Sequence, residues 1–406
     1  MINRKKVHID FLHKFNRETW ILILFAVSLL KEYFLDGALV FITISEGIRF
    51  FSLAIDVVIY LSLFLFICKG KYTRKEISII AAGYLLMLVV CLSAGERGLL
   101  PFWTWIILVK TVSYDKWIRA SLYCHCIGLA VGIIATATGI HQDIMVQGRS
   151  VLATRYTFGL GQPNFTGNIL FLIAACYCWL KKEKLNKKDY LFLAVITAIT
   201  YIFMNSLGTT VVMLVFVCTI FLFQRVVPDG KETRRGLLIL FYMSMAFAGL
   251  AVILSVINVS DIPLLGRIDK IMSYRFADVY RTFKVYGLSL FGQEFDFTEL
   301  NTYVRLEGER NFYMDCMWIY LLSHYGIIFS IIFIYVYFSS MYRFVKKEET
   351  LTVIIFFCGA LYAMEQRIWP FLFGWVFMIF LAESLFGNDT SSANFGKQRR
   401  KLMGER

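Results

Sequence analysis

Long apolar runs constrain this chain more than any other feature of its sequence. A helix needs about 20 apolar residues to cross a bilayer. Runs of nearly this length or longer lie near 20–35, 48–68, 77–92, 99–113, 118–140, 163–180, 190–206, 209–224, 236–257, 313–342, 351–364 and 369–386. They predict an all-α polytopic membrane protein with about 12 transmembrane helices. The composition, 58% apolar and 17% charged, excludes a soluble globular domain and a disordered chain.

The basic residues predict how these helices are oriented. A formal net charge of +13 gathered on one folded face would indicate nucleic-acid binding, but here Lys and Arg fall in short clusters between apolar runs. Typical clusters are KGKYTRKE (69–76), KKEKLNKK (181–188) and RFVKK (343–347). If both termini are cytoplasmic, most of these clusters lie on the cytoplasmic side, as the positive-inside rule requires. The basicity therefore indicates orientation and no nucleic-acid partner.

This topology divides the chain into four parts. Residues 1–257 hold the first nine helices and an outer loop at 141–162, and residues 258–312 form one long extracytoplasmic loop. Residues 313–387 hold the last three helices, and residues 388–406 form a basic cytoplasmic tail. The long loop is the only segment large enough for structure outside the bilayer.

The long loop contains one amphipathic pattern, between 270 and 292. At helical spacing its apolar residues, among them Phe276 and Val279, share one face, while Arg275, Asp278 and Arg281 share the other. We expect a helix that lies at the lipid headgroups, turns its polar face to a cavity and ends at a glycine, Gly287 or Gly292. A solvated loop helix is the alternative interpretation.

The positive-inside rule does not explain the arginines of the outer loops, because it places basic residues on the cytoplasmic side. A guanidinium group holds phosphate through paired hydrogen bonds and stays charged at any relevant pH. Several arginines at headgroup level therefore suggest an anionic, phosphorylated ligand outside the cytoplasm. Ordinary pairing with Asp278, Glu294 and Asp296 is the alternative.

Few charges lie inside the apolar runs. Asp56 does, and Arg49 is its expected partner. Glu365, Gln366 and Arg367 are expected at the final external turn, where they can line the same cavity. The chain has no nucleotide-binding or metalloprotease motif, and its Cys-x-Cys pairs point to different sides of a helix, so we expect neither a metal nor another cofactor.

Three segments in order resemble a known family. They are RYTFGLGQPNFTGNILF (155–171), SYRFADVYRTFKVYGLSLFGQEF (273–295) and YMDCMWIYLLSHYGII (313–328). Together they resemble bacterial Wzy-type polysaccharide polymerases, which share a superfamily with O-antigen ligases. The resemblance implies a GT-C-like membrane glycosyltransferase of the cytoplasmic (inner) membrane. Such an enzyme polymerises undecaprenyl-diphosphate-linked oligosaccharide repeat units at the outer face without a metal.

The resemblance also implies roles for individual residues. Arg155 and Arg275 would hold and neutralise the diphosphate leaving group. Arg281 with Gly292 fits an Arg-x10-Gly pattern of some polymerases, whereas Arg149 and Arg155 do not keep this spacing. These arginines, with Asn164 and Gln162 of the first segment, are the expected substrate-binding residues: Arg155, Arg281, Arg149, Asn164 and Gln162.

Asp315 stands where ligases of the superfamily usually carry a histidine, which favours a polymerase over a ligase. Its carboxylate could accept the proton of the attacking sugar hydroxyl or orient the acceptor. Asp315 and Arg275 are therefore the expected catalytic residues. His324, farther along the same run, is expected to have a core or cavity role.

Two other functions remain open at this stage. A ligase-like transferase would move finished glycan to another acceptor, and a twelve-helix transporter or flippase would move lipid-linked oligosaccharide. The expected partners are the lipid-linked glycan donor and acceptor and the bilayer, with a flippase and a chain-length regulator of the same pathway as further candidates.

Overall fold

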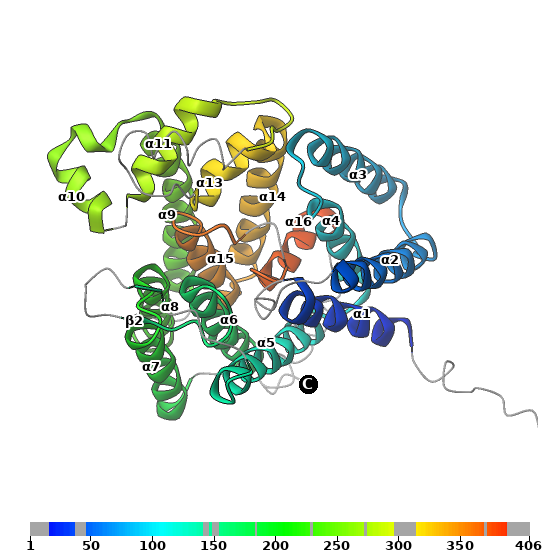
Figure 1. Ribbon diagram of the computed structural model, residues 1–406, viewed down its shortest axis with the longest axis horizontal. Coiled ribbons are helices and arrows are strands. Elements are labelled where there is room, and N and C mark those ends of the chain that lie inside the picture. The colour runs from blue at the N-terminus through cyan, green and yellow to red at the C-terminus, as the bar shows by residue number, and fades with distance from the viewer. Residues whose placement is uncertain are drawn as a thin grey trace, which may run out of the picture.

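The computed structural model describes residues 16–36, 46–140, 146–147, 154–182, 185–227, 230–271, 274–295, 314–368 and 372–387. Helices account for nearly all regular structure in these ranges (Figure 1). Their order is α1 (Arg17–Lys31), η1 (Glu32–Asp36), α2 (Glu46–Cys68), α3 (Arg74–Ala94), α4 (Leu99–Leu108), η2 (Val109–Thr111), α5 (Tyr114–Ala137), α6 (Pro163–Lys181), α7 (Lys187–Ile202), α8 (Leu207–Arg225), α9 (Lys231–Val256), η3 (Val259–Asp261), α10 (Pro263–Ile271), α11 (Arg275–Tyr286), α13 (Met317–Tyr320), η4 (Leu321–Tyr325), α14 (Ile327–Lys346), α15 (Thr350–Tyr362), η5 (Val376–Leu381) and α16 (Ala382–Phe386).

The predicted fold class, an all-α membrane-embedded protein, is confirmed. Among the described residues, seven helices are long and apolar enough to cross a bilayer: α2, α3, α5, α6, α8, α9 and α14. Shorter apolar helices of 10 to 17 residues accompany them. The count of 12 spans and the GT-C-like arrangement stay predictions. The strands β1 (Val146–Gln147) and β2 (Thr154–Arg155) form one short antiparallel pair.

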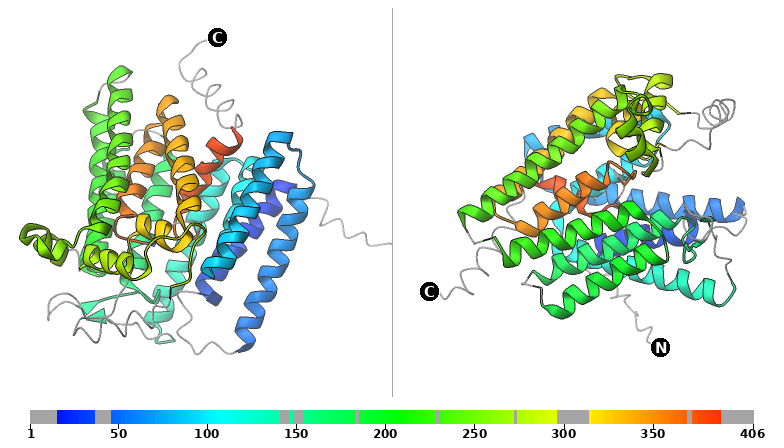
Figure 2. Two further views of the ribbon diagram at one scale, coloured as in Figure 1. Left: turned by 90° about the horizontal axis from the view of Figure 1, so that it is seen from above. Right: turned by 90° about the vertical axis from the view of Figure 1, so that its left-hand side faces the viewer.

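The bundle is organised around α15 and α6. Helix α15 packs against α8, α9 and α14, and α6 packs against α5, α7 and α8 (Figure 2). Most side chains of both helices are buried, whereas α2 and α3 turn many apolar side chains outward. In a membrane these outward side chains contact lipid, which explains why they are not covered by protein.

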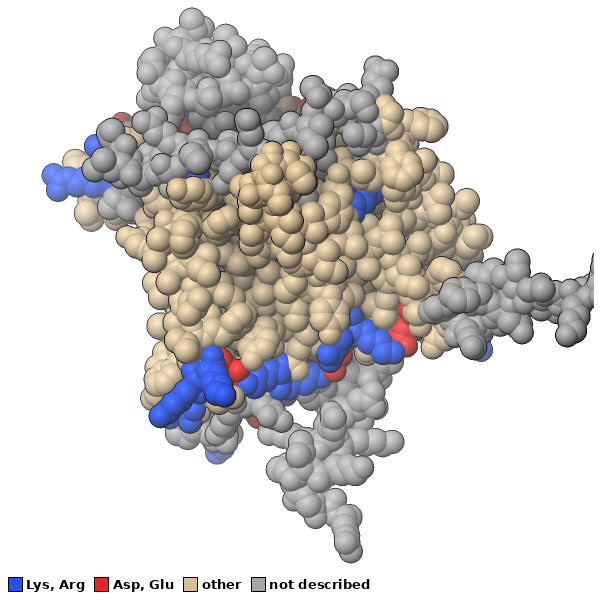
Figure 3. All heavy atoms as spheres, turned by 60° about the horizontal axis from the view of Figure 1, so that its bottom comes forward, with Lys and Arg blue, Asp and Glu red and all other residues tan. Residues whose placement is uncertain are grey.

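Lysine and arginine side chains gather at one end of the bundle, below a band of uncharged side chains (Figure 3). Ion pairs tie the helix termini together there, since Lys116 Nζ lies 2.6 Å from Glu18 Oε2 and Lys182 Nζ lies 2.6 Å from Asp115 Oδ1. We call this the basic end. It holds the starts of α1, α3, α5, α7, α9 and α15 and the ends of α2, α6, α8 and α14.

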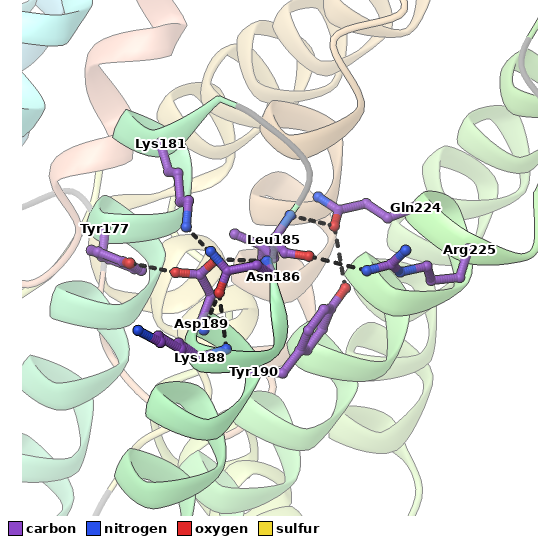
Figure 4. Close-up of polar contacts among 9 residues, drawn as sticks. All are labelled: Tyr177, Lys181, Leu185, Asn186, Lys188, Asp189, Tyr190, Gln224 and Arg225. Atoms are coloured by element: carbon purple, nitrogen blue, oxygen red, sulfur yellow. Dashed lines mark hydrogen bonds and ion pairs between the residues drawn. The ribbon is translucent and has the colours of Figure 1, made fainter.

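The α6–α7 turn shows how the basic end is fixed (Figure 4). Asn186 caps α7 by accepting from the backbone N–H groups of Lys188 and Asp189 at 2.9 and 3.2 Å. The Asp189 carboxylate accepts in return from Asn186 N at 2.6 Å and from the Tyr177 hydroxyl at 2.6 Å, and it pairs with Lys181. This capping box satisfies backbone donors that would otherwise lack partners.

Asp56 has a partner within the apolar part of the bundle. Lys31 Nζ at the end of α1 lies 2.8 Å from Asp56 Oδ2, midway along α2. The structure therefore pairs Asp56 with Lys31 rather than with the expected Arg49, whose side chain lies outside the described residues. Pairing lowers the cost of two charges in a helix bundle that lipid surrounds.

The apolar run at 313–342 does not form one helix. It is broken at Gly326, whose φ of 89° no helical residue adopts. The loop at 289–293 fills the break, because its Ser289 carbonyl accepts from Ile327 N at 2.9 Å and its Gln293 N donates to the His324 carbonyl at 2.9 Å. Protein groups thus satisfy the backbone where the helix is interrupted.

The expected amphipathic helix is shorter than predicted. Two helices, α10 and α11, are separated by Tyr274, which has a left-handed conformation with φ 62°. Helix α11 ends at Gly287, as predicted, and buries Arg275, Asp278 and Thr282 together with Phe276. Arg275 and Asp278 of its polar face are therefore packed inside the protein, whereas Arg281 is partly exposed.

We predict that Gly292→Ala lowers the thermal unfolding temperature measured in detergent. Gly292 has φ 104°, and an added Cβ would lie 2.7 Å from the His324 carbonyl oxygen. Such backbone strain costs about 1–3 kcal/mol. Gly249→Ala is the matched control, since Gly249 lies in α9 with no atom within 4 Å of an added Cβ. Equal unfolding temperatures for the two variants would contradict the packing of the 289–293 loop.

Candidate functional site

Arg275 is held at the first position of α11 by the turn that precedes it. Asp269 in α10 is almost fully buried and accepts from Phe276 N at 2.8 Å and Ala277 N at 3.2 Å. These bonds satisfy the first free N–H groups of α11 and place a negative charge at its N-terminus. The turn thus aims the Arg275 side chain into the bundle, at the end opposite the basic end.

The Arg275 guanidinium lies between two carboxylates. Its Nη1 is 3.0 Å from Asp315 Oδ2, and its Nη2 is 3.6 Å from Glu365 Oε1. Nη1 also donates to the backbone carbonyl of Glu365. We call Arg275, Asp315 and Glu365 the Arg275 cluster. Burial alone would lower the pKa of Arg275, but Asp315 and Glu365 raise it above its ordinary value.

The two carboxylates of the Arg275 cluster differ in exposure. The side chains of Arg275 and Glu365 are 8% and 10% exposed, whereas that of Asp315 is 29% exposed. Glu365 therefore belongs to the buried wall of the site, and Asp315 faces the outside. An anion that approaches Arg275 from outside meets Asp315 first.

Gly208 makes room for Glu365. The Glu365 carboxylate occupies the space in which a Cβ of Gly208 would lie, in the first turn of α8. A carboxylate at a helix N-terminus is stabilised by the helix dipole. Glu365 is thus stabilised by Arg275 on one side and by the start of α8 on the other.

A second set of polar contacts, the Asn164 network, starts from Arg155. Arg155 Nη2 donates to Asn164 Oδ1 at 2.7 Å, and Arg155 Nε donates to the Met204 carbonyl at 2.9 Å. Ser206 donates to the same Asn164 oxygen at 3.0 Å. Arg155 is therefore fixed between the start of α6 and the α7–α8 turn.

The Asn164 network reaches the Arg275 cluster through α8 and α15. Ser206 and Thr209 are joined at 2.9 Å, and Thr209 is joined to the Tyr362 hydroxyl at 2.7 Å. Tyr362 is fully buried, and Gly208, which lies between Ser206 and Thr209 in the sequence, is in contact with the Glu365 carboxylate. One polar region at this end of the bundle thus contains both arginines that the resemblance singles out.

The structure brings four of the expected site residues together: Arg155, Asn164, Arg275 and Asp315. Arg281 lies on α11, with its Nη1 3.9 Å from Asp278 Oδ1, so the alternative to ligand binding, ordinary pairing with Asp278, is present for this arginine. Gln162 is the exposed N-cap residue of α6. Arg149 lies outside the described residues. The catalytic and binding roles of all these residues stay predictions.

Sequence reasoning missed Gly208, Ser206, Thr209 and Tyr362 as parts of this site. The segment SLGTT (206–210) resembles an ordinary helix start, and Tyr362 sits in an apolar run. Glu365 was expected near the cavity, and its contact with Arg275 agrees with that expectation. Among the described residues, no group of three or more His, Cys, Asp or Glu side chains could hold a metal ion.

Comparisons with known protein families, with curated proteins and with solved structures find no match to this chain.

We predict that Gly208→Ala destabilises the protein by about 1–3 kcal/mol, because the added methyl group displaces the buried Glu365 carboxylate from Arg275. Thermal unfolding in detergent measures the effect. Adding Glu365→Asp to this variant shortens the acidic side chain by one methylene and should restore part of the loss. A Gly208→Ala protein as stable as the wild type would refute the contact.

Proposed function

We propose that the protein is a membrane glycosyltransferase that polymerises undecaprenyl-diphosphate-linked oligosaccharide repeat units into surface polysaccharide. The observation that carries this proposal is the buried Arg275 with Asp315 at 3.0 Å, in one polar region with Arg155. The resemblance to Wzy-type polymerases assigns these same three residues to the reaction. Their convergence from separate sequence segments supports the proposal.

The Arg275 cluster suits a diphosphate leaving group. With two carboxylates and one guanidinium group, the cluster carries a net negative charge. An incoming diphosphate must therefore replace one of the carboxylates at Arg275. Asp315 is the more exposed partner and is the one that can be displaced. Glu365 would keep the guanidinium in place during the exchange. Charge then develops on the leaving diphosphate beside a fixed guanidinium, which lowers the barrier.

Once the diphosphate has displaced it from Arg275, the Asp315 carboxylate would be able to contact the acceptor hydroxyl. In the proposed reaction the bond from the sugar anomeric carbon to the diphosphate oxygen breaks, and a bond to the acceptor hydroxyl oxygen forms. Asp315 would accept the hydroxyl proton, and the diphosphate would leave with the electron pair of the broken bond. Arg275 and Arg155 would be the cations nearest the leaving diphosphate.

The sidedness of the bundle supports an outer active site. Positive charge concentrates at the basic end, which the positive-inside rule assigns to the cytoplasm. The Arg275 cluster lies at the opposite end. The protein would therefore act at the outer face of the cytoplasmic membrane, with both termini inside.

One observation favours a transporter or flippase as the second candidate. The pair Lys31–Asp56 lies within the apolar part of the bundle, where charged groups often belong to a transport pathway. A ligase-like transferase would use the Arg275 cluster in the same way and differ only in its acceptor.

We predict that a strain lacking the gene accumulates single repeat units, and that Arg275→Lys does not restore long chains. Lysine lacks the planar fork that binds two phosphate oxygens at once. Gel sizing of lipid-linked and surface glycan measures the outcome. Arg235→Lys at the exposed basic end is the matched control and should restore wild-type ladders.

Protein levels in the membrane must match for this comparison, which immunoblotting establishes. Long chains that persist on the lipid carrier in the deletion strain would indicate a ligase or transporter instead. Normal chain length with Arg275→Lys would remove Arg275 from the reaction.

We also predict opposite reporter activities at the two ends of α9. Alkaline phosphatase fused after Ser260 should be active, and the same fusion after Gly230 should be inactive, because this enzyme folds only outside the cytoplasm. Green fluorescent protein at the same positions should give the reverse pattern. Activity after Gly230 would overturn the proposed orientation.

A further inference from the structure

Helix α10 has three faces of different character. At about 100° per residue, Leu264 and Ile268 share one face, and both side chains are exposed, at 68% and 41%. Arg267 and Lys270, which are also exposed, follow on one side of this face. Asp269 lies on the other side, is 1% exposed and contacts α11. An exposed apolar face beside basic residues is typical of a helix that lies in the plane of a membrane surface.

The position of α10 places it at the boundary of the membrane. The helix projects sideways from the bundle at the end of α9 that lies opposite the basic end (Figures 1 and 2). Helix α9 is long and apolar enough to cross the bilayer, and its last turn exposes Ile253 and Val256. Ile262, just before α10, is exposed as well. Exposed apolar side chains thus continue along the chain from the lipid-facing part of α9 into α10.

We propose that α10 lies on the bilayer surface on the side of the Arg275 cluster and binds anionic phospholipids there. Leu264 and Ile268 would contact the acyl chains, and Arg267 and Lys270 would contact the phosphates. The exposed charges of α10 are both positive, so they complement anionic headgroups. Lipid would also cover the apolar face that the protein leaves exposed. This contact goes beyond the proposed function and does not depend on glycosyl transfer.

The buried face of α10 connects this contact to α11. The Asp269 carboxylate accepts from Phe276 N at 2.8 Å and from Ala277 N at 3.2 Å, and the Asp269 carbonyl accepts from Tyr274 N at 2.7 Å. One residue of α10 therefore holds both the turn before α11 and the first N–H groups of that helix. An α10 that is fixed on lipid thus keeps Arg275 in place, and its lipid-facing side chains act as positioning residues.

Reaction of introduced cysteines with a charged, membrane-impermeant maleimide tests the lipid contact. Leu264→Cys and Lys270→Cys are a matched pair, because both positions are exposed in the protein and only Leu264 would be covered by acyl chains. The full-length protein is placed in nanodiscs of phosphatidylglycerol that hold one copy, and the wild type gives the background of the native cysteines. We expect Lys270→Cys to react at least tenfold faster, with each rate divided by that of the same variant in dodecyl sulfate. Equal rates would overturn the contact.

The same pair of variants identifies the lipid and tests for another occupant. Phosphatidylcholine in place of phosphatidylglycerol should weaken the protection of Leu264→Cys at least threefold, because the basic side chains then lose their anionic partners. Equal protection in the two lipids would overturn the preference for anionic headgroups. Protection that appears only in nanodiscs with two copies would assign the apolar face to a second copy and overturn the lipid contact.

Hydrogen–deuterium exchange in the same nanodiscs tests the positioning of α11. Leu264→Glu should detach α10 from lipid and speed exchange of the Phe276 and Ala277 amides at least tenfold, and Ile268→Glu should act in the same way. Ser260→Glu is the matched control, since it adds the same charge at an exposed position before α10 and should leave the exchange unchanged. Unchanged exchange in Leu264→Glu and Ile268→Glu would overturn the positioning role. Faster exchange in Ser260→Glu as well would also overturn it, because added charge alone would then explain the effect.

Discussion

The buried Arg275 cluster, formed by Arg275, Asp315 and Glu365, holds together the end of the bundle that lies opposite the basic end. A guanidinium group this deeply buried requires carboxylates beside it, since desolvation of an unpaired charge costs several kcal/mol. Its partners come from the start of α13 and from the turn after α15, so three distant segments must meet at one point. Gly208 allows the approach by leaving space for the Glu365 carboxylate at the start of α8.

The broken helix at Gly326 ties the outer loop to the membrane bundle. Two glycines with positive φ, Gly292 and Gly326, let the backbones approach closely, and the loop at 289–293 then satisfies the N–H groups at the start of α14. These hydrogen bonds satisfy backbone groups that the break leaves without helical partners, so the loop and the break stabilise each other. This gives a physical reason for a glycine at position 292, because an added Cβ there would crowd the His324 carbonyl.

The proposed function assigns the diphosphate of the donor to the Arg275 cluster. This cluster is largely buried, and its two carboxylates outnumber its one guanidinium group. A donor needs a fixed cation where charge develops, and an acceptor needs only to be held in reach.

The sequence by itself determined the membrane class and the concentration of Lys and Arg between apolar runs, and it limited the end of α11 to Gly287 or Gly292, because apolar length, charge and glycine act locally. It also identified Arg155, Arg275, Asp315 and Glu365 as candidate site residues. Only the tertiary structure decided that Lys31 pairs with Asp56, that the 313–342 run breaks at Gly326, and that Gly208, Thr209 and Tyr362 join the site. These contacts link residues far apart in the chain, and no local pattern records which distant helix face a side chain will meet.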